Sequence, residues 1–70
     1  MKKDIIKNAL YNQVEVTDVE NHICVGWLVP RKKEYLLLPL DDAFHIHVYY
    51  ASHIKSIKFI TNGVTLRDSI

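Results

Sequence analysis

Residues 41–50, DDAFHIHVYY, are the part of the chain richest in side chains that could bind a metal or a base. His45 and His47 are two residues apart, so on a β-strand both imidazoles project from one face, with Cα atoms about 6–7 Å apart. Two such ligands could share one zinc ion, but zinc takes three or four. The others could come from Asp41, Asp42, His53 or a histidine of another subunit. Because the chain has no Cys-x-x-Cys or His-Glu-x-x-His spacing, we predict no metal site, and a polar strand face at a subunit contact instead.

Two further groups of side chains could contact nucleic acid. Tyr49 lies on the same predicted strand face as the two histidines, where its ring could stack on a base. The alternative is cross-strand packing, in which tyrosine is common because its hydroxyl can stay in water. Arg31, Lys32 and Lys33 form the only basic run beyond the N-terminus. Repeated around a ring they could bind phosphates; otherwise they form a solvated hairpin loop.

Composition and charge exclude several functional classes. The 70 residues are 49% hydrophobic and 24% charged, which is typical of one compact domain over residues 1–70. The formal net charge of +1 is too balanced for non-specific nucleic-acid binding. The only glycines, Gly26 and Gly63, form no phosphate-binding loop, and Ser52 and His53 are neighbours in sequence only. We therefore predict a protein that is not an enzyme and uses neither a cofactor nor a small-molecule substrate.

Cysteine content and hydropathy predict the compartment. The single cysteine, Cys24, excludes an internal disulfide and favours reducing surroundings. The longest apolar run, YLLLPL, is far shorter than the about 20 residues that a membrane-spanning helix needs. We expect a cytoplasmic protein without a membrane segment.

Hydrophobic periodicity indicates which elements position these side chains. The apolar residues of 5–10 share one face of a helix over about 4–11, with Asp4 placed as its N-cap. From residue 13 the period changes to two, as in strands, and turn residues recur at intervals of about 8–12. The sequence thus predicts a mainly β fold, with five or six short antiparallel strands forming a small closed or half-open barrel over about 13–67.

Two of the expected strands carry the features that matter for the site. In the strand over 22–29, Gly26 permits a sharp bend or a close backbone approach, and we expect Trp27 in the core. The strand over 44–50 alternates most cleanly. We expect its core-facing residues to be Phe44, Ile46 and Val48, and its outward-facing residues to be His45, His47 and Tyr49. Near the end of the chain, Asn62–Gly63 predicts a tight primed hairpin turn before a short returning strand.

The order of these features resembles the Sm-like (LSm and Hfq-like) family of small β-barrels. The matching segments are DIIKNAL in the helix, ICVGWL with Gly26 in the second strand, YLLL in the third, and VYYASHIKSI across the fourth and fifth. The resemblance covers roughly residues 4–57. It implies a strongly bent five-stranded Sm-like or SH3-like barrel that forms a homo-oligomeric ring and binds single-stranded RNA. In such rings the fourth strand of one subunit pairs with the fifth of the next, which implies that the subunit contacts include Phe44, His45, His47, Tyr49, Lys55 and Ile57.

Two functional hypotheses follow. The first is an Sm-like, non-enzymatic RNA-binding protein that works like an RNA chaperone, with loop cations on phosphates and exposed tyrosine or histidine on bases. Its expected RNA contacts are Arg31, Lys32, Lys33, His45, His47, Tyr49 and His53. The second is an SH3-like protein–protein interaction module without nucleic-acid binding, in which an exposed strand edge recruits a polypeptide.

Overall fold

The structure is a computed structural model that describes residues 1–41 and 45–68. Its elements, in chain order, are α1 (Lys3–Ile6), the 3-10 helix η1 (Lys7–Ala9), β1 (Gln13–Asp18), β2 (Ile23–Arg31), β3 (Glu34–Leu38), β4 (His47–Tyr49), the 3-10 helix η2 (Ala51–His53), β5 (Ile54–Phe59) and β6 (Thr65–Arg67). No helix in the described part of the chain is long and apolar enough to cross a membrane.

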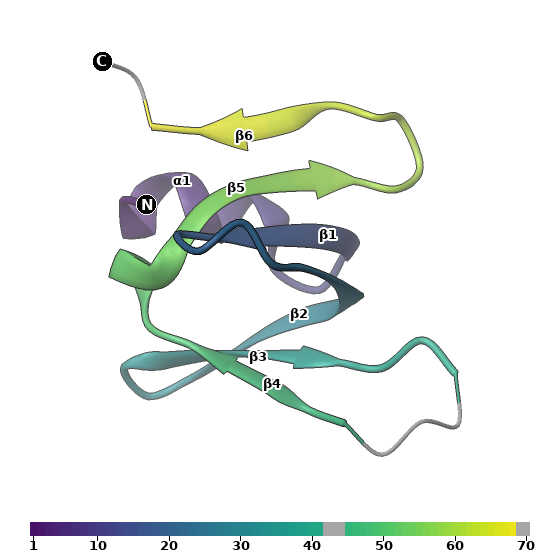
Figure 1. Cartoon of the computed structure of the whole chain (residues 1–70), viewed down its shortest axis with the longest axis horizontal. Helices are drawn as coiled ribbons and strands as arrows, with labels where there is room; N and C mark the ends of the chain where they lie inside the picture. Colours follow the sequence, from purple (N-terminus) through teal and green to yellow (C-terminus); the bar gives the residue numbers. More distant parts are fainter. Residues whose placement is uncertain (42–44, 69–70) are drawn as a thin grey trace.

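The strands form one antiparallel sheet of six, in the order β4-β3-β2-β1-β5-β6 (Figure 1). The mainly β fold with a short N-terminal helix is confirmed. The structure differs from the predicted five-stranded barrel in having six strands and an open sheet, with β4 and β6 at its edges. The sixth strand arises where the chain turns back after β5 and β6 pairs with it, Ile57 opposite Leu66. As a result, β5 has neighbours on both sides, β1 and β6.

The helix is shorter than its periodicity predicts. Lys2, not Asp4, is the N-cap residue, and no side chain caps the helix. Leu10 is already extended, and Tyr11 has a φ of 66°, in the left-handed region that ends a right-handed helix. The predicted apolar face is nonetheless confirmed, since Ile6 and Ala9 are fully buried.

The core lies on one face of the sheet, which we call the inner face. Residues that are partners in an antiparallel ladder point to the same side, and the buried residues follow this rule across neighbouring strands. Val16 pairs with Ile57, and Leu28 pairs with Leu37. The buried hydrophobic residues are Met1, Ile6, Ala9, Val14, Val16, Leu28, Tyr35, Leu37, Tyr49, Ile54 and Ile57.

At Gly26, β2 passes close to β3. A Cβ at this position would lie 2.9 Å from Leu37 Cγ and would clash with the carbonyl oxygen of Leu38. The close backbone approach expected of this glycine is therefore confirmed. Between its ends, β2 passes from pairing with β1 to pairing with β3.

The side of β2, β3 and β4 that faces away from the core is apolar, which two expectations missed. Trp27 is 39% exposed and lies on this side rather than in the core. Val48 is 52% exposed and Ile46 54%, whereas Tyr49 is 6% exposed, so the predicted burial of these three residues is wrong. His45 and His47 are exposed, as predicted. Tyr49 is opposite buried Tyr35, and this contact sets the inward face of β4. Phe44 lies outside the described residues.

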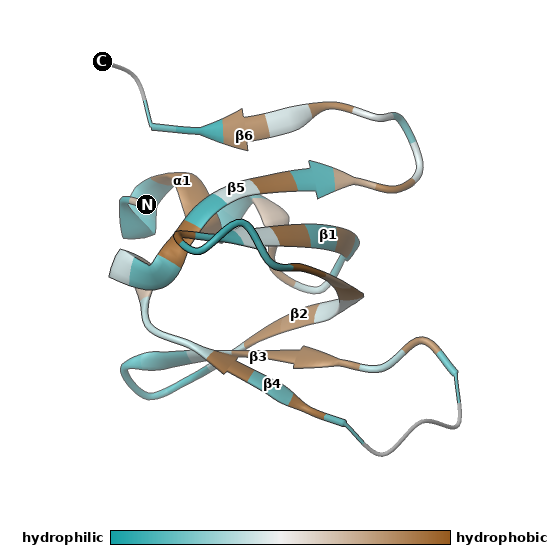
Figure 2. Cartoon of the chain, viewed as in Figure 1, coloured by the Kyte–Doolittle hydropathy of each residue, from teal (hydrophilic) through white to brown (hydrophobic). Residues whose placement is uncertain are grey.

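We call this surface the outer apolar face. Ladder partners join Trp27 to Leu38, and Val29 to Leu36 and Val48. Figure 2 shows hydrophobic colour along β2 and β3 and at intervals along β4. The outer apolar face consists of Trp27, Val29, Leu36, Leu38 and Val48.

The turn between β5 and β6 is looser than Asn62–Gly63 predicted. Gly63 has a φ of 72°, but Asn62 is not among the residues with positive φ, so a two-residue primed turn does not form. The Phe59 N–H donates to the Val64 carbonyl across a four-residue loop, and the Val64 N–H donates to Asn62 Oδ1.

Candidate interaction site around β4

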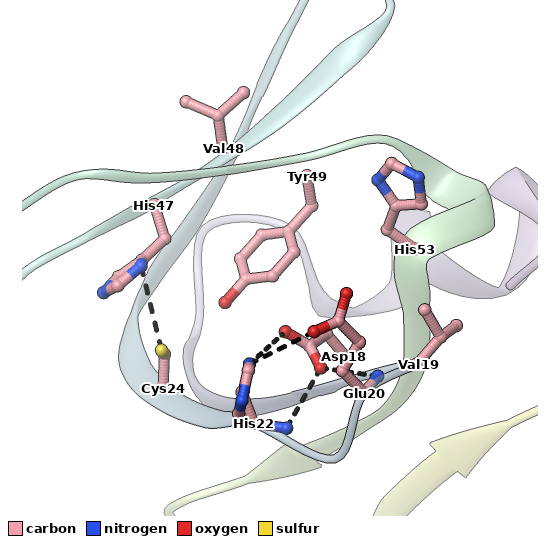
Figure 3. Close-up of a pocket in the computed structure, with 9 residues that line it drawn as sticks. All are labelled: Asp18, Val19, Glu20, His22, Cys24, His47, Val48, Tyr49 and His53. Carbon is pink, nitrogen blue, oxygen red and sulfur yellow. Dashed lines mark hydrogen bonds and ion pairs between the residues drawn. The ribbon is translucent and has the colours of Figure 1, made fainter.

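β4 separates two surfaces of different chemistry. Its inner side carries His47 and Tyr49, the ladder partners of the buried Leu37 and Tyr35. Its outer side carries Val48, which in Figure 3 points away from His47 and Tyr49. A short strand at the sheet edge therefore borders a polar hollow on one side and the outer apolar face on the other.

The polar hollow, which we call the β4 pocket, has a volume of about 540 Å³. Three segments far apart in sequence form it: the end of β1 with the turn into β2, the strand β4, and η2 (Figure 3). Its lining residues are Asp18, Val19, Glu20, His22, Cys24, His47, Val48, Tyr49 and His53.

Asp18 organises the β1–β2 turn that forms one wall. Its Oδ1 accepts hydrogen bonds from the backbone N–H groups of Glu20 (2.8 Å) and His22 (3.0 Å), and its Oδ2 lies 3.6 Å from His22 Nδ1. The hydrogen bond from the His22 N–H, helped by that from Glu20 and by nearby His22 and His53, lowers the pKa of Asp18 below its usual 3.8. Asp18 is therefore ionised at neutral pH, and this wall of the β4 pocket is acidic.

The opposite wall brings Tyr49, His47 and Cys24 together. Burial, which disfavours the phenolate, raises the pKa of Tyr49 above its usual value of 10.0, and a hydrogen bond with the Cys24 thiol adds to the effect. Cys24 Sγ lies 3.8 Å from His47 Nδ1, a weak contact, and the cysteine is free and half-buried. Within residues 1–41 and 45–68, no three or more His, Cys, Asp or Glu side chains are placed to hold a metal ion.

The residues expected to contact RNA fall into separate places. His47, Tyr49 and His53 line the β4 pocket. His45 lies beside a second hollow of about 390 Å³, bordered by Val25, Pro39, Leu40, Asp41 and His47. Arg31, Lys32 and Lys33 form the exposed end of the β2–β3 hairpin and line neither hollow.

The residues expected at subunit contacts are also dispersed. Ile57 is fully buried, and Tyr49 nearly so, within the core of a single chain. Lys55 is exposed, and its Nζ donates to Asn21 Oδ1 over 2.7 Å. Since β5 is already flanked by β1 and β6, a ring that pairs residues 44–50 with 54–60 of a neighbour would need β6 to leave.

Sequence reasoning missed the acidic wall. In the sequence, Asp18 has the residue type and position of an ordinary turn residue, and only the fold brings it beside β4. A signal for the outer apolar face does exist in the sequence, because ICVGWLV and YLLL are apolar at nearly every position. A strand with one face in water alternates, so unbroken apolar runs indicate that both faces are covered.

The two edges of the sheet differ in how they are protected. Natural edge strands are usually shielded from further pairing by charges, proline or bulges. β6 ends in Arg67 and is followed by Asp68, whereas residues 46–50, Ile-His-Val-Tyr-Tyr, contain neither an Asp, Glu, Lys or Arg side chain nor a proline. Ile46 and Tyr50 are 54% and 53% exposed. In comparisons with known proteins, no family model, no curated protein and no solved structure matches this chain.

Proposed function

We propose that this protein is a non-enzymatic protein–protein interaction domain that adds a strand of a partner polypeptide to β4. The observation that carries the proposal is the unprotected β4 edge beside the outer apolar face. An edge strand offers a row of unpaired N–H and C=O groups, which supply affinity in strand addition. Alternate side chains of the added strand would pack beside Val48 and extend the outer apolar face.

The proposal keeps the Sm-like or SH3-like kinship as a hypothesis about ancestry of the fold. The short helix before an antiparallel sheet and the close approach of β2 to β3 at Gly26 support it. The free cysteine, Cys24, fits reducing surroundings such as the cytoplasm.

RNA binding is the second candidate, and one observation favours it. Arg31, Lys32 and Lys33 are all exposed at one hairpin end, where they could contact phosphates. The β4 pocket is a poor continuation of that surface, because ionised Asp18 and exposed Glu20 repel phosphate.

Selection from a displayed library of random linear peptides tests strand addition. We expect the peptides retained by the immobilised protein to alternate apolar residues, and their binding to be lost in Val48→Lys. The control is Val64→Lys, because Val64 is 50% exposed, like Val48 at 52%, but lies in the β5–β6 turn. Peptides that bind both variants equally would contradict the proposal.

Single-stranded oligo(U) and oligo(A) at low salt test the second candidate in parallel. Binding that is unaffected by Val48→Lys but lost when Arg31, Lys32 and Lys33 are all changed to Ala would favour RNA. Absence of binding at low salt, where phosphate attraction is strongest, would exclude it.

A further inference from the structure

We infer that the strand that pairs with β4 is the β4 of a second copy of this chain, giving a two-fold dimer with one continuous sheet. The inference rests on the proposed function and names its partner. A two-fold dimer uses the same patch on both copies, so the edge must be complementary to itself.

The sequence of the edge meets this condition. Antiparallel pairing centred on Val48 places Val48 opposite Val48 of the second copy, and Ile46 opposite its Tyr50. All of these side chains are at least half-exposed, with values of 52%, 54% and 53% for Val48, Ile46 and Tyr50. β-Branched and aromatic side chains opposite one another stabilise antiparallel pairs. On the other side of the strand, His47 would lie opposite Tyr49 of the second copy, so no like charges are brought together at neutral pH.

The outer apolar face gives a reason for pairing. In a single copy the row from Val29 through Leu36 ends at the exposed Val48. Pairing about Val48 joins this row to its symmetry equivalent, which shields the exposed ends of both rows. Chains of this length often complete a small core by oligomerisation, and Cys24, the only cysteine, provides no internal disulfide.

The expected dimer is weak. A standard interface takes about 800 Å² from each partner, and the whole chain exposes 4986 Å². Pairing through residues 46–50 alone covers less than that standard area. We therefore expect a dissociation constant on the order of 10 µM rather than nanomolar.

Sedimentation equilibrium across concentrations from about 1 to about 500 µM tests the dimer. We expect the mass to rise from 8.2 kDa to twice that value as the concentration rises. Val48→Lys removes the Val48–Val48 contact and places two ammonium groups opposite each other at the two-fold axis, so dimerisation should weaken about 10-fold. Val64→Lys should leave the dimer unchanged.

Disulfide trapping tests the register. In a Cys24→Ser background, Val48→Cys places the two new thiols directly opposite each other, within the Cα separation of about 4.4–6.8 Å that a disulfide spans. Mild oxidation should cross-link this variant, and Val64→Cys should stay uncross-linked under the same conditions.

The outcomes separate the dimer from the function on which it rests. If the chain is monomeric at every concentration but binds selected peptides, and Val48→Lys does not bind them, the dimer is overturned and strand addition stands. The dimer proposal is also overturned if Val48→Lys dimerises as tightly as the unchanged chain, or if Val48→Cys chains do not cross-link. A monomer that selects no peptide overturns both.

Discussion

Gly26→Ala tests the role of the close approach between β2 and β3. The new methyl group would lie 2.9 Å from Leu37 Cγ and 3.0 Å from the Leu38 carbonyl carbon, in addition to its clash with the Leu38 oxygen. Carbon atoms pack best at about 3.5–4.0 Å, so β3 would have to move by roughly half an ångström or more. Two of the three obstructing atoms belong to the backbone and cannot rotate away.

The magnitude follows from this geometry. Overpacking typically costs about 1–3 kcal/mol, and a backbone obstacle favours the upper end. Alanine also lowers the conformational entropy of the unfolded chain, which stabilises the folded state by about 0.4–1 kcal/mol. The net loss of about 2–2.6 kcal/mol compares with the about 3–5 kcal/mol that a single core of this size supplies. The melting temperature should fall by about 10–20 °C.

Urea unfolding, followed by both Trp27 fluorescence and far-ultraviolet circular dichroism at one protein concentration, measures the loss. Gly63→Ala is the matched control, because Gly63 has a φ of 72° but no atom within 4 Å of an added Cβ. The unfolding free energy of Gly63→Ala should fall by only about 1 kcal/mol, the cost of holding an alanine in the left-handed conformation. If Gly26→Ala is as stable as Gly63→Ala, the close approach does not constrain the sheet and the reasoning fails.

Three further predictions concern the core and the β4 pocket. Leu28→Ala leaves a cavity at a fully buried site and should lower the unfolding free energy by about 2–5 kcal/mol in urea titrations. Val48→Ala, at an exposed site, should lower it by less than about 1 kcal/mol. Equal losses would contradict the assigned faces. Because the pKa of Tyr49 is raised, its contribution to stability is fully present below pH 10.0 and is lost as the pH rises beyond that value. The unfolding free energy of Tyr49→Phe should therefore decline less steeply above pH 10.0 than that of the unchanged protein. In a titration followed by phenolate absorbance, this variant should lack the tyrosine step that occurs at the highest pH. The lowered pKa of Asp18 contributes stability above pH 3.8, and this contribution is lost as the pH falls through the lower pKa of the folded state. The unfolding free energy of Asp18→Asn should therefore depend less on pH below 3.8. An unchanged pH dependence would refute the hydrogen-bonded turn.

Periodicity predicted most of the strands but not which side of them is buried. The alternation in the sequence of 44–50 indicates that Val48 and Tyr49 point in opposite directions. In β1, Val14 and Val16 alternate with polar residues and both are fully buried. The inward side of β4 depends on Tyr35 lying opposite Tyr49, a contact between strands that local pattern does not contain. For this reason the apolar residues Ile46 and Val48 were assigned to the core and are in fact exposed.

The candidate site was less predictable than the strands. His47, Tyr49 and His53 were singled out as binding residues, and all three do line the β4 pocket. Asp18, at the end of β1, lines the same pocket only because the fold brings the β1–β2 turn beside β4. The short returning strand expected after Asn62–Gly63 is present as β6, Thr65–Arg67, paired with β5.

The difference between the two sheet edges sets how far association can go. In the proposed dimer, pairing of the two β4 strands uses the edge of each copy that lacks a charged side chain in the described chain, and both ends of the joined sheet are then β6, with Arg67 and Asp68. A sheet whose free ends are charged resists further growth, so pairing should terminate at a discrete particle rather than propagate into a fibril. Replacing Arg67 with an apolar residue would remove that stop, and the protein would then carry a hazard of open-ended polymerisation that its present sequence avoids.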